Sequence, residues 1–203
     1  MLQILRTLLI GLMLTIGASI VRAGPLEDGN AAYQRGDIAT ALRLLQPLAE
    51  QGNAYAQFSL GVMYANGQGV TQDYKEAVEW YRRSAEQGFA IAQSNLGVMY
   101  ANGRGVSQDY KEAVKWLRLA AEQGNAIAQS NLGLIYENGQ GVTQDFLRAY
   151  MWINLAASKL SGVEGQRATT NRDRIAKSLT PAQVVQAQEM ARQCGAKNFK
   201  NCD

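Results

Sequence analysis

A unit of 36 residues occurs three times in succession within this 203-residue chain. The units span residues 53–88, 89–124 and 125–160, and the first two carry the same amino acid at 26 positions. Residues 37–52 align with residues 73–88 at the same offset, so a degenerate unit covers residues 25–52. Tandem units of this length bury their apolar faces on one another, which favours a solenoid of stacked helical or strand units over a single globular core.

The repeated unit contains the start and stop signals of two helices. In residues 53–88 the first apolar group ends at Gly67, since glycine can adopt the left-handed conformation that closes a helix. Asp73 then precedes a second helical segment as an N-cap, with Glu76 as its capping-box partner, and Gly88 ends the unit. No segment has the alternating pattern of a strand. The sequence therefore predicts an all-α fold of at least eight helices in antiparallel pairs.

Small side chains recur at fixed positions of the unit, where two helices must approach each other closely. Glycine occupies one such position and alanine two others, and a tryptophan recurs nearby. A missing side chain allows two helix backbones to pack at short distance, and the large indole fills the remaining space. These positions predict the core of the stack: Gly61, Gly97, Gly133, Ala77, Ala113, Ala149, Ala85, Ala121, Ala157, Trp80, Trp116 and Trp152.

The spaced pattern AxAQxxLGxxYxxGxGVxxDYxxAxxWxxxAAxQG runs through these units. It resembles the Sel-one-like repeat, a relative of the tetratricopeptide repeat with a longer loop between its helices, over about residues 37–160. The resemblance implies an α/α superhelix whose first helices line a concave face. It also implies an adaptor or scaffold, and bacterial members of the family are often exported.

The chain leaves the repeat pattern after Leu160. Residues 164–177 can form a helix, and Thr180, Pro181 and Gln183 start another as N-cap, first helical residue and capping-box partner. A solenoid needs a polar terminal element to cover its last apolar face. We therefore interpret residues 24–160 as the repeat solenoid and residues 161–203 as its C-terminal helical cap with a cysteine tail.

Cys194 and Cys202 are the two cysteines of the chain, and both lie in this tail. In an oxidising compartment they can pair and close a short loop, so we predict a structural disulfide. The alternative is a redox-active or partner-linking thiol. Neither a histidine nor a Cys-X-X-Cys motif is present to lower a thiol pKa.

Residues 1–23 have the organisation of a signal peptide. Arg6 precedes an apolar run over residues 8–21, and Val21 and Ala23 suit signal peptidase, which predicts cleavage after Ala23. The run is short for the roughly 20 residues that span a bilayer, and an uncleaved membrane anchor is the alternative. We expect a periplasmic or secreted protein of a Gram-negative bacterium, with no membrane span after cleavage.

Composition excludes several kinds of chemistry. Without residues 1–23 the chain keeps 18 basic and 17 acidic residues, a net charge of +1 that gives no sign of a nucleic-acid partner. No histidine is present, which excludes Ser-His-Asp and Cys-His nucleophiles and histidine zinc sites. Glycine pairs such as Gly67 and Gly69 follow helices and lack the Lys-Ser/Thr of a phosphate loop. We expect no enzyme, no cofactor and no metal site.

By similarity to the tetratricopeptide arrangement, Leu60, Gly61 and Tyr64 face the interior, and four other positions of each first helix face a groove. These positions are mostly apolar, which suits an amphipathic helix or an extended apolar segment of a protein or peptide partner. The alternative is that some of them pack against neighbouring helices. The predicted groove residues are Tyr55, Phe58, Val62, Ala65, Ile91, Ser94, Val98, Ala101, Ile127, Ser130, Leu134 and Glu137.

Three functions fit these observations. The first is a non-enzymatic protein-interaction scaffold or adaptor in the bacterial envelope. The second is a cell-wall or β-lactam-related enzyme or small-ligand binder, because cysteine-rich relatives of the repeat family are linked to penicillin binding. Those relatives carry paired cysteines within each repeat, and the repeats of this chain carry none. The third is a structural accessory of an envelope machine such as a flagellar motor or secretion complex.

Overall fold

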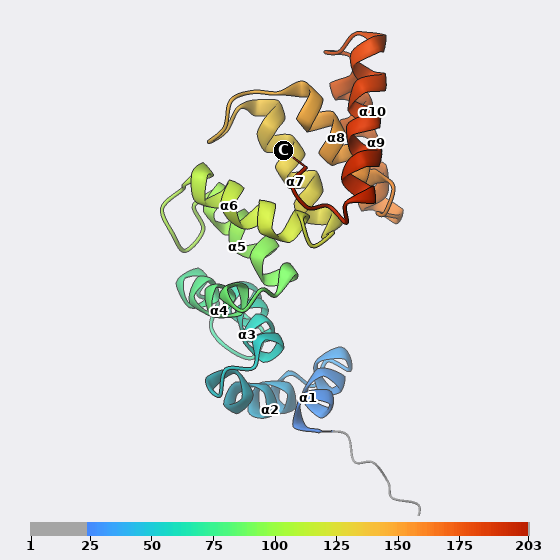
Figure 1. Ribbon diagram of the computed structural model, residues 1–203. Helices are drawn as coiled ribbons and strands as arrows, with labels where there is room; N and C mark the ends of the chain where they lie inside the picture. The colour runs from blue at the N-terminus through green and yellow to red at the C-terminus, as the bar shows by residue number, and fades with distance from the viewer. Residues whose placement is uncertain (1–23, 203) are drawn as a thin grey trace, which may run out of the picture.

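A computed structural model describes residues 24–202 (Figure 1). Within this range the chain forms ten α-helices and no strand, which confirms the all-α fold. Residues 1–23, with the predicted signal peptide and cleavage site, lie outside the described residues. The helices are α1 (Pro25–Gln34), α2 (Ile38–Glu50), α3 (Ala54–Asn66), α4 (Tyr74–Glu86), α5 (Ala90–Asn102), α6 (Tyr110–Ala121), α7 (Ala126–Asn138), α8 (Phe146–Ala157), α9 (Gly162–Ala176) and α10 (Pro181–Ala196).

The helices form hairpins that stack in one direction. α1 packs on α2, α3 on α4, α5 on α6 and α7 on α8, and the second helix of each hairpin also packs on the first helix of the next. Figure 1 shows the hairpins rising from α1 to α8, with α3 and α5 recessed between α1 at one end and α9 at the other. The first helices therefore form the inner side of a curved stack.

The glycines predicted to allow close helix approach lie where helices meet. A methyl group added at Gly97 on α5 would lie 2.7 Å from Cγ of Leu117 and 3.1 Å from the carbonyl oxygen of Ala113, both on α6. The same addition at Gly61 on α3 would lie 2.5 Å from the ring of Tyr81 on α4. Only glycine fits these contacts without a shift of the neighbouring helix.

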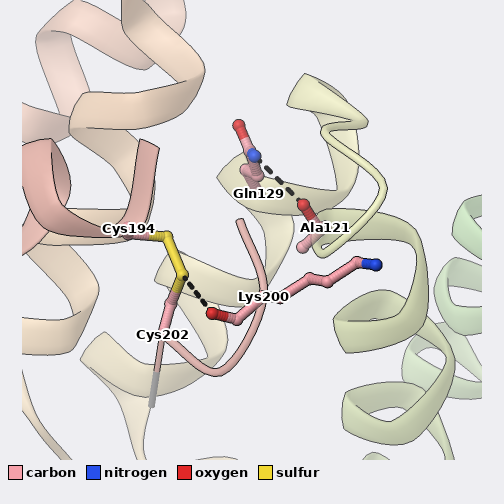
Figure 2. The surroundings of a disulfide bond; sticks show 5 residues. All are labelled: Ala121, Gln129, Cys194, Lys200 and Cys202. Carbon is pink, nitrogen blue, oxygen red and sulfur yellow. Dashed lines mark hydrogen bonds between the residues drawn. A yellow bond between two sulfur atoms is a disulfide. The ribbon is translucent and has the colours of Figure 1, made fainter. Parts of the chain in front are cut away.

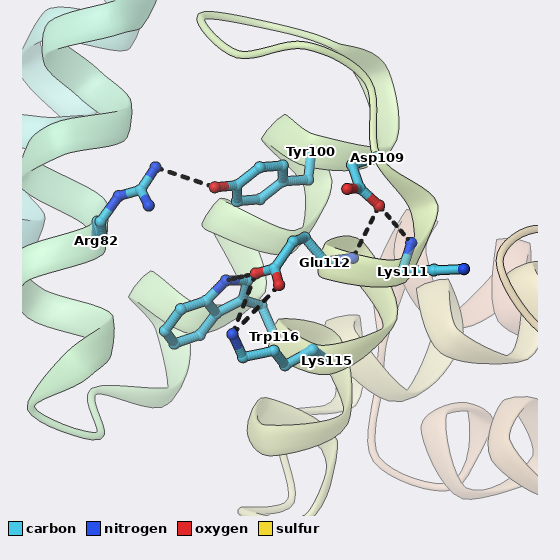
Figure 3. A network of polar contacts seen from close by, with 7 residues as sticks. All are labelled: Arg82, Tyr100, Asp109, Lys111, Glu112, Lys115 and Trp116. Carbon is cyan, nitrogen blue, oxygen red and sulfur yellow. Dashed lines mark hydrogen bonds and ion pairs between the residues drawn. The ribbon is translucent and has the colours of Figure 1, made fainter.

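Aspartates cap the second helices at their N-termini, as predicted. Oδ1 of Asp109 accepts hydrogen bonds from the backbone N–H groups of Lys111 at 2.8 Å and Glu112 at 3.1 Å, and Asp73 caps α4 in the same way. The Glu112 carboxylate, expected to complete a capping box, accepts a hydrogen bond from Nε1 of Trp116 at 3.2 Å (Figure 3). The aspartates thus cap both helices, whereas the predicted capping boxes are not formed at α4 and α6, where the aspartate alone caps the helix and the Glu112 carboxylate binds Trp116 instead.

The Gly-x-Gly loops pack against the preceding hairpin. Gly105, with a left-handed φ of 71°, lies against the backbone at the start of α4, where a methyl group on it would be 2.9 Å from the nitrogen of Lys75. Gly69 takes the same place beside Ile38 at the start of α2. These loops join the two helices of one hairpin and contact the second helix of the preceding hairpin, and this close contact accounts for their glycines.

Buried glutamines also connect the hairpins, and the repeat pattern alone does not predict this feature. Nε2 of Gln57 donates to the carbonyl oxygen of Ala49 at 3.1 Å, and its Oε1 accepts from Nε2 of Gln87 at 2.7 Å. One unit later Gln93 and Gln123 form the same pair of bonds, at 3.0 and 2.7 Å. We call this row of hydrogen bonds the glutamine ladder, and the units of residues 53–88 and 89–124 each contribute one complete rung.

Helices α9 and α10 both pack on α8, at the C-terminal end of the stack. α10 begins with the predicted capping box of Thr180 and Gln183. Beyond it the chain turns back, and Cys194 is bonded to Cys202 with an S–S distance of 2.05 Å, which confirms the predicted disulfide. Over residues 24–202 no helix combines the length and the apolar character needed to cross a membrane. The capping role of residues 161–203, like the domain boundaries above, stays a prediction.

Candidate partner-binding groove

One face of each first helix remains open to solvent. On α3 it consists of Tyr55 and the residues four, seven and eleven positions later, a spacing that keeps side chains on one side of a helix. The same positions are at least partly exposed on α5 and α7, where Ile91 is 47% and Ile127 40% exposed. We call this set the groove stripe: Tyr55, Ser59, Val62, Asn66, Ile91, Asn95, Val98, Asn102, Ile127, Asn131, Leu134 and Asn138.

Half of the predicted groove residues belong to the groove stripe: Tyr55, Val62, Ile91, Val98, Ile127 and Leu134. The others lie beside it, at positions three or ten residues after the first member: Phe58, Ala65, Ser94, Ala101, Ser130 and Glu137. Phe58 and Ala65 pack partly against the core cluster that contains Leu96. Ser94 and Glu137 are only 2% and 8% exposed. Packing against neighbouring helices, the alternative interpretation, describes several members of this second set.

A pocket of about 150 Å³ lies between α5 and α7 in the middle of the stripe. Three predicted residues line it, together with two asparagines from different hairpins that were not predicted. Asparagines recur one unit apart, at positions 95 and 131 and at positions 102 and 138. A helical-wheel projection of the repeated units would have placed them on this face. The lining residues are Val98, Ala101, Asn102, Leu117, Asn131, Leu134 and Ile135.

The N-terminal end of the stripe is aromatic. Tyr55 lines a second pocket, of about 160 Å³, with Leu26 and Asn30 of α1, and its hydroxyl donates to Oδ1 of Asn30 at 2.7 Å. The rings of Tyr55, Phe58 and Phe89 have centroids 5.4 to 6.3 Å apart. The structure therefore brings the two predicted aromatic anchors, Tyr55 and Phe58, into one cluster between α3 and α5.

The groove is electrically almost neutral. Among the residues of α3, α5 and α7, Glu137 is the one with a charged side chain. Its carboxylate accepts hydrogen bonds from both terminal nitrogens of Arg174 on α9, the one from Nη2 at 2.8 Å. This ion pair neutralises Glu137, so α3, α5 and α7 offer a partner apolar and amide groups without net charge, while Glu27 of α1 lines the pocket beside Tyr55.

Asn95 of the groove stripe is connected to the core beneath it. Tyr81 of α4 is buried under Gly61 and shares a hydrogen bond with Asn95. Burial raises the pKa of Tyr81 to about 12, while the bond to Asn95 acts in the opposite direction. The phenol therefore stays neutral at physiological pH.

Arginines of the second helices hold tyrosines of the next first helix. Nη2 of Arg82 donates to the hydroxyl of Tyr100 at 3.0 Å, a contact between α4 and α5 that Figure 3 shows. Arg118 repeats it with Tyr136 at 2.7 Å. These bonds fix the first helices to the preceding hairpin. Within residues 24–202 no group of three or more His, Cys, Asp or Glu side chains is placed to hold a metal ion.

Two solved structures resemble this chain in fold and sequence. A protective antigen present in uropathogenic Escherichia coli strains, which displays an SLR fold, has a TM-score of 0.73 and 32% identity over 87% of this chain. The match spans 42% of that antigen's length. A Sel1 repeat protein from Oxalobacter formigenes has a TM-score of 0.71 and 31% identity, and the match covers 89% of this chain and 71% of that one. No curated protein matches the chain.

The Sel1 repeat model matches four consecutive segments, residues 20–53, 54–89, 90–125 and 126–159. Each segment contains one hairpin of the stack, from α1 with α2 to α7 with α8. The resemblance indicated by the repeated pattern is thereby confirmed. Proteins built from these repeats are generally protein-interaction scaffolds and typically non-catalytic. This chain is a member of the Sel1 repeat family.

Proposed function

We propose that this protein is a non-catalytic scaffold that binds a peptide segment of a partner protein along the groove stripe. The observation that carries the proposal is the pocket between α5 and α7, where the amides of Asn102 and Asn131 border an apolar floor. The general role of Sel1 repeat proteins as interaction scaffolds supports it.

The chemistry of this pocket suits an extended, uncharged peptide. A carboxamide has one acceptor and two donors and can pair with both the N–H and the C=O of a peptide backbone. Asn102 and Asn131 therefore recognise the main chain, while a medium-sized apolar side chain fills the space between Val98 and Leu134. A charged side chain there would lose its hydration without gaining a counter-ion, which disfavours acidic or basic ligands.

The proposal is tested by selecting peptides from a random displayed library on the mature chain and measuring their dissociation constants. Asn131→Ala removes a hydrogen-bonding amide at the surface, so it should weaken selected peptides about fivefold to tenfold, as the loss of one hydrogen bond does. Leu134→Ala should weaken them through lost apolar contact. Lys111→Ala, an exposed change on α6, is the control and should bind as the wild type does.

Melting temperatures of the same variants separate a lost contact from a damaged fold. If Asn131→Ala and Leu134→Ala keep both their stability and their affinity for every selected peptide, the groove is not the binding face. Selected peptides rich in acidic or basic residues would also contradict the assignment of an apolar ligand.

We further propose that the protein is exported and that residues 1–23 are removed. The Cys194–Cys202 disulfide supports this location, since disulfides persist in oxidising compartments such as the periplasm. Intact-mass measurement of the protein from cells should give a chain that begins at Gly24. A membrane-bound chain that begins at Met1 would instead show the uncleaved anchor.

A further inference from the structure

The glutamine ladder is interrupted at its third rung. Nε2 of Gln129 donates to the carbonyl oxygen of Ala121 at 3.1 Å, as in the earlier rungs, and Figure 2 shows this bond beside the disulfide. Oε1 of Gln129, however, is buried and has no hydrogen-bond partner among the described residues. Lys159 stands at the position that Gln87 and Gln123 occupy in the two preceding units. The donor of the third rung is therefore a lysine that points elsewhere.

Lys159 lies between the turn before α7 and the C-terminal tail. Its Nζ donates to the carbonyl oxygen of Gly124 at 3.1 Å and lies 3.7 Å from the centroid of the Phe199 ring, a favourable position for a cation. A methyl group at Gly124 would lie 3.2 Å from Cε2 of Phe199. At Gly52 and Gly88, the equivalent turns, nothing lies within 4 Å. Among the described units, the tail thus covers the turn before α7 alone.

The disulfide keeps Phe199 in this place. Three residues of the loop that it closes have left-handed φ angles: Asn198 at 52°, Phe199 at 65° and Asn201 at 53°. Residues with a Cβ atom rarely adopt this conformation, and they keep it when their surroundings force it. The backbone N–H of Phe199 donates to the carbonyl oxygen of Cys194 at 2.9 Å, and the bond to Cys202 closes the loop around it. Opening the loop leaves these residues held by the backbone bonds at the end of α10 and removes the covalent link that closes the turn.

We propose that the Cys194–Cys202 loop is a thiol-sensitive latch that determines which of two partners Lys159 binds. With the disulfide formed, Lys159 stays on Phe199 and the Gly124 carbonyl. With the disulfide reduced, the left-handed residues relax and Phe199 leaves the turn. Lys159 then donates to Oε1 of Gln129, which completes the third rung and leaves the turn before α7 as open as the earlier ones.

A dithiol reductant opens the latch by thiol–disulfide exchange. Its thiolate attacks Sγ of Cys202, because Cys202 is partly exposed whereas Cys194 is buried. The S–S bond breaks, and Cys194 leaves as a thiolate that takes up a proton. The second thiol of the reductant then attacks the mixed disulfide and frees Cys202. Two electrons pass to the protein, and the products are two cysteine thiols and a cyclic disulfide.

The test is nuclear magnetic resonance of the mature chain with labelled lysine and glutamine, before and after reduction by dithiothreitol. In the oxidised protein the ε-protons of Lys159 should be shifted upfield by the Phe199 ring. After reduction this upfield shift should be lost, and the side-chain amide of Gln129 should shift at the same time. Hydrogen exchange at the Phe199 amide should become at least tenfold faster.

Three variants define the end states. Phe199→Ala should give the reduced-state position of Lys159 with the disulfide intact, and Lys159→Gln should fill the third rung in both redox states. The double variant Cys194→Ser and Cys202→Ser should give the same spectrum with and without dithiothreitol. An upfield Lys159 signal that survives complete reduction would overturn the latch, and so would a Gln129 amide that stays unchanged after Lys159 has left the ring.

Discussion

Replacing Gly97 by alanine measures how tightly a hairpin interior is packed. The added methyl group would lie 2.7 Å from Cγ of Leu117 and 3.1 Å from the carbonyl oxygen of Ala113. Leu117 is buried and the oxygen belongs to a helix backbone, so neither atom can move away freely. Overpacking costs about 1–3 kcal/mol, and the gain from replacing glycine within a helix offsets about 0.5–1 kcal/mol of it. We expect the free energy of unfolding to fall by about 1–2 kcal/mol.

Gly195 on α10 provides a matched control, because nothing lies within 4 Å of the methyl group that alanine would add there. Gly195→Ala should raise the free energy of unfolding by about 0.5–1 kcal/mol. Urea unfolding followed by far-ultraviolet circular dichroism measures both variants under identical conditions. If Gly97→Ala were as stable as the wild type while Gly195→Ala gained stability, the hairpin interior would have space that the structure does not show, and the reasoning would be refuted.

Three further changes have defined outcomes. Asp109→Ala leaves the N–H groups at the start of α6 without their acceptor and should cost about 1 kcal/mol in urea unfolding, whereas an unchanged midpoint would contradict the cap. Cys194→Ser should lower the free energy of unfolding by about 2–3 kcal/mol relative to the oxidised protein, and dithiothreitol should then have no further effect on melting. The free energy of unfolding should fall as pH rises from about 10 towards 12, because burial raises the pKa of Tyr81 to about 12 and the unfolded chain loses this proton at lower pH. Tyr81→Phe should remove this part of the pH dependence.

The helices could be predicted because their signals are local. Gly67 has a left-handed φ of 67° at the end of α3, and Asp73 caps α4 a few residues later. Both roles depend on the backbone of the same short segment. The glutamine ladder could not be predicted in this way, because the acceptor of Gln57 is a carbonyl of the preceding hairpin and its donor lies at the far end of its own hairpin.

The groove could be predicted in part, because a helix turns by about 100° per residue. Residues four and seven positions after Tyr55 stay on the same side, whereas residues three and ten positions after it turn towards a neighbouring helix. Ser59 therefore lies on the open face, and Phe58 lies beside it, partly buried. Glu137 is buried for a separate reason, since its partner Arg174 comes from a helix outside the repeat pattern.

The glutamine ladder allows the stack to grow by whole units. Residues 89–124 supply both glutamines of one rung, since Gln93 donates a hydrogen bond to the preceding hairpin and Gln123 donates one to Gln93 within the same hairpin. A second copy inserted after Gly124 would contact the preceding unit as the present copy does, through a backbone carbonyl for its glutamine, a helix start for its Gly-x-Gly loop and an arginine for its tyrosine. Tandem duplication of the gene segment would thus lengthen the inner face by one helix without a new interface. The ladder of complete rungs ends at Lys159. The length of the inner face is therefore set by the number of units encoded before this residue.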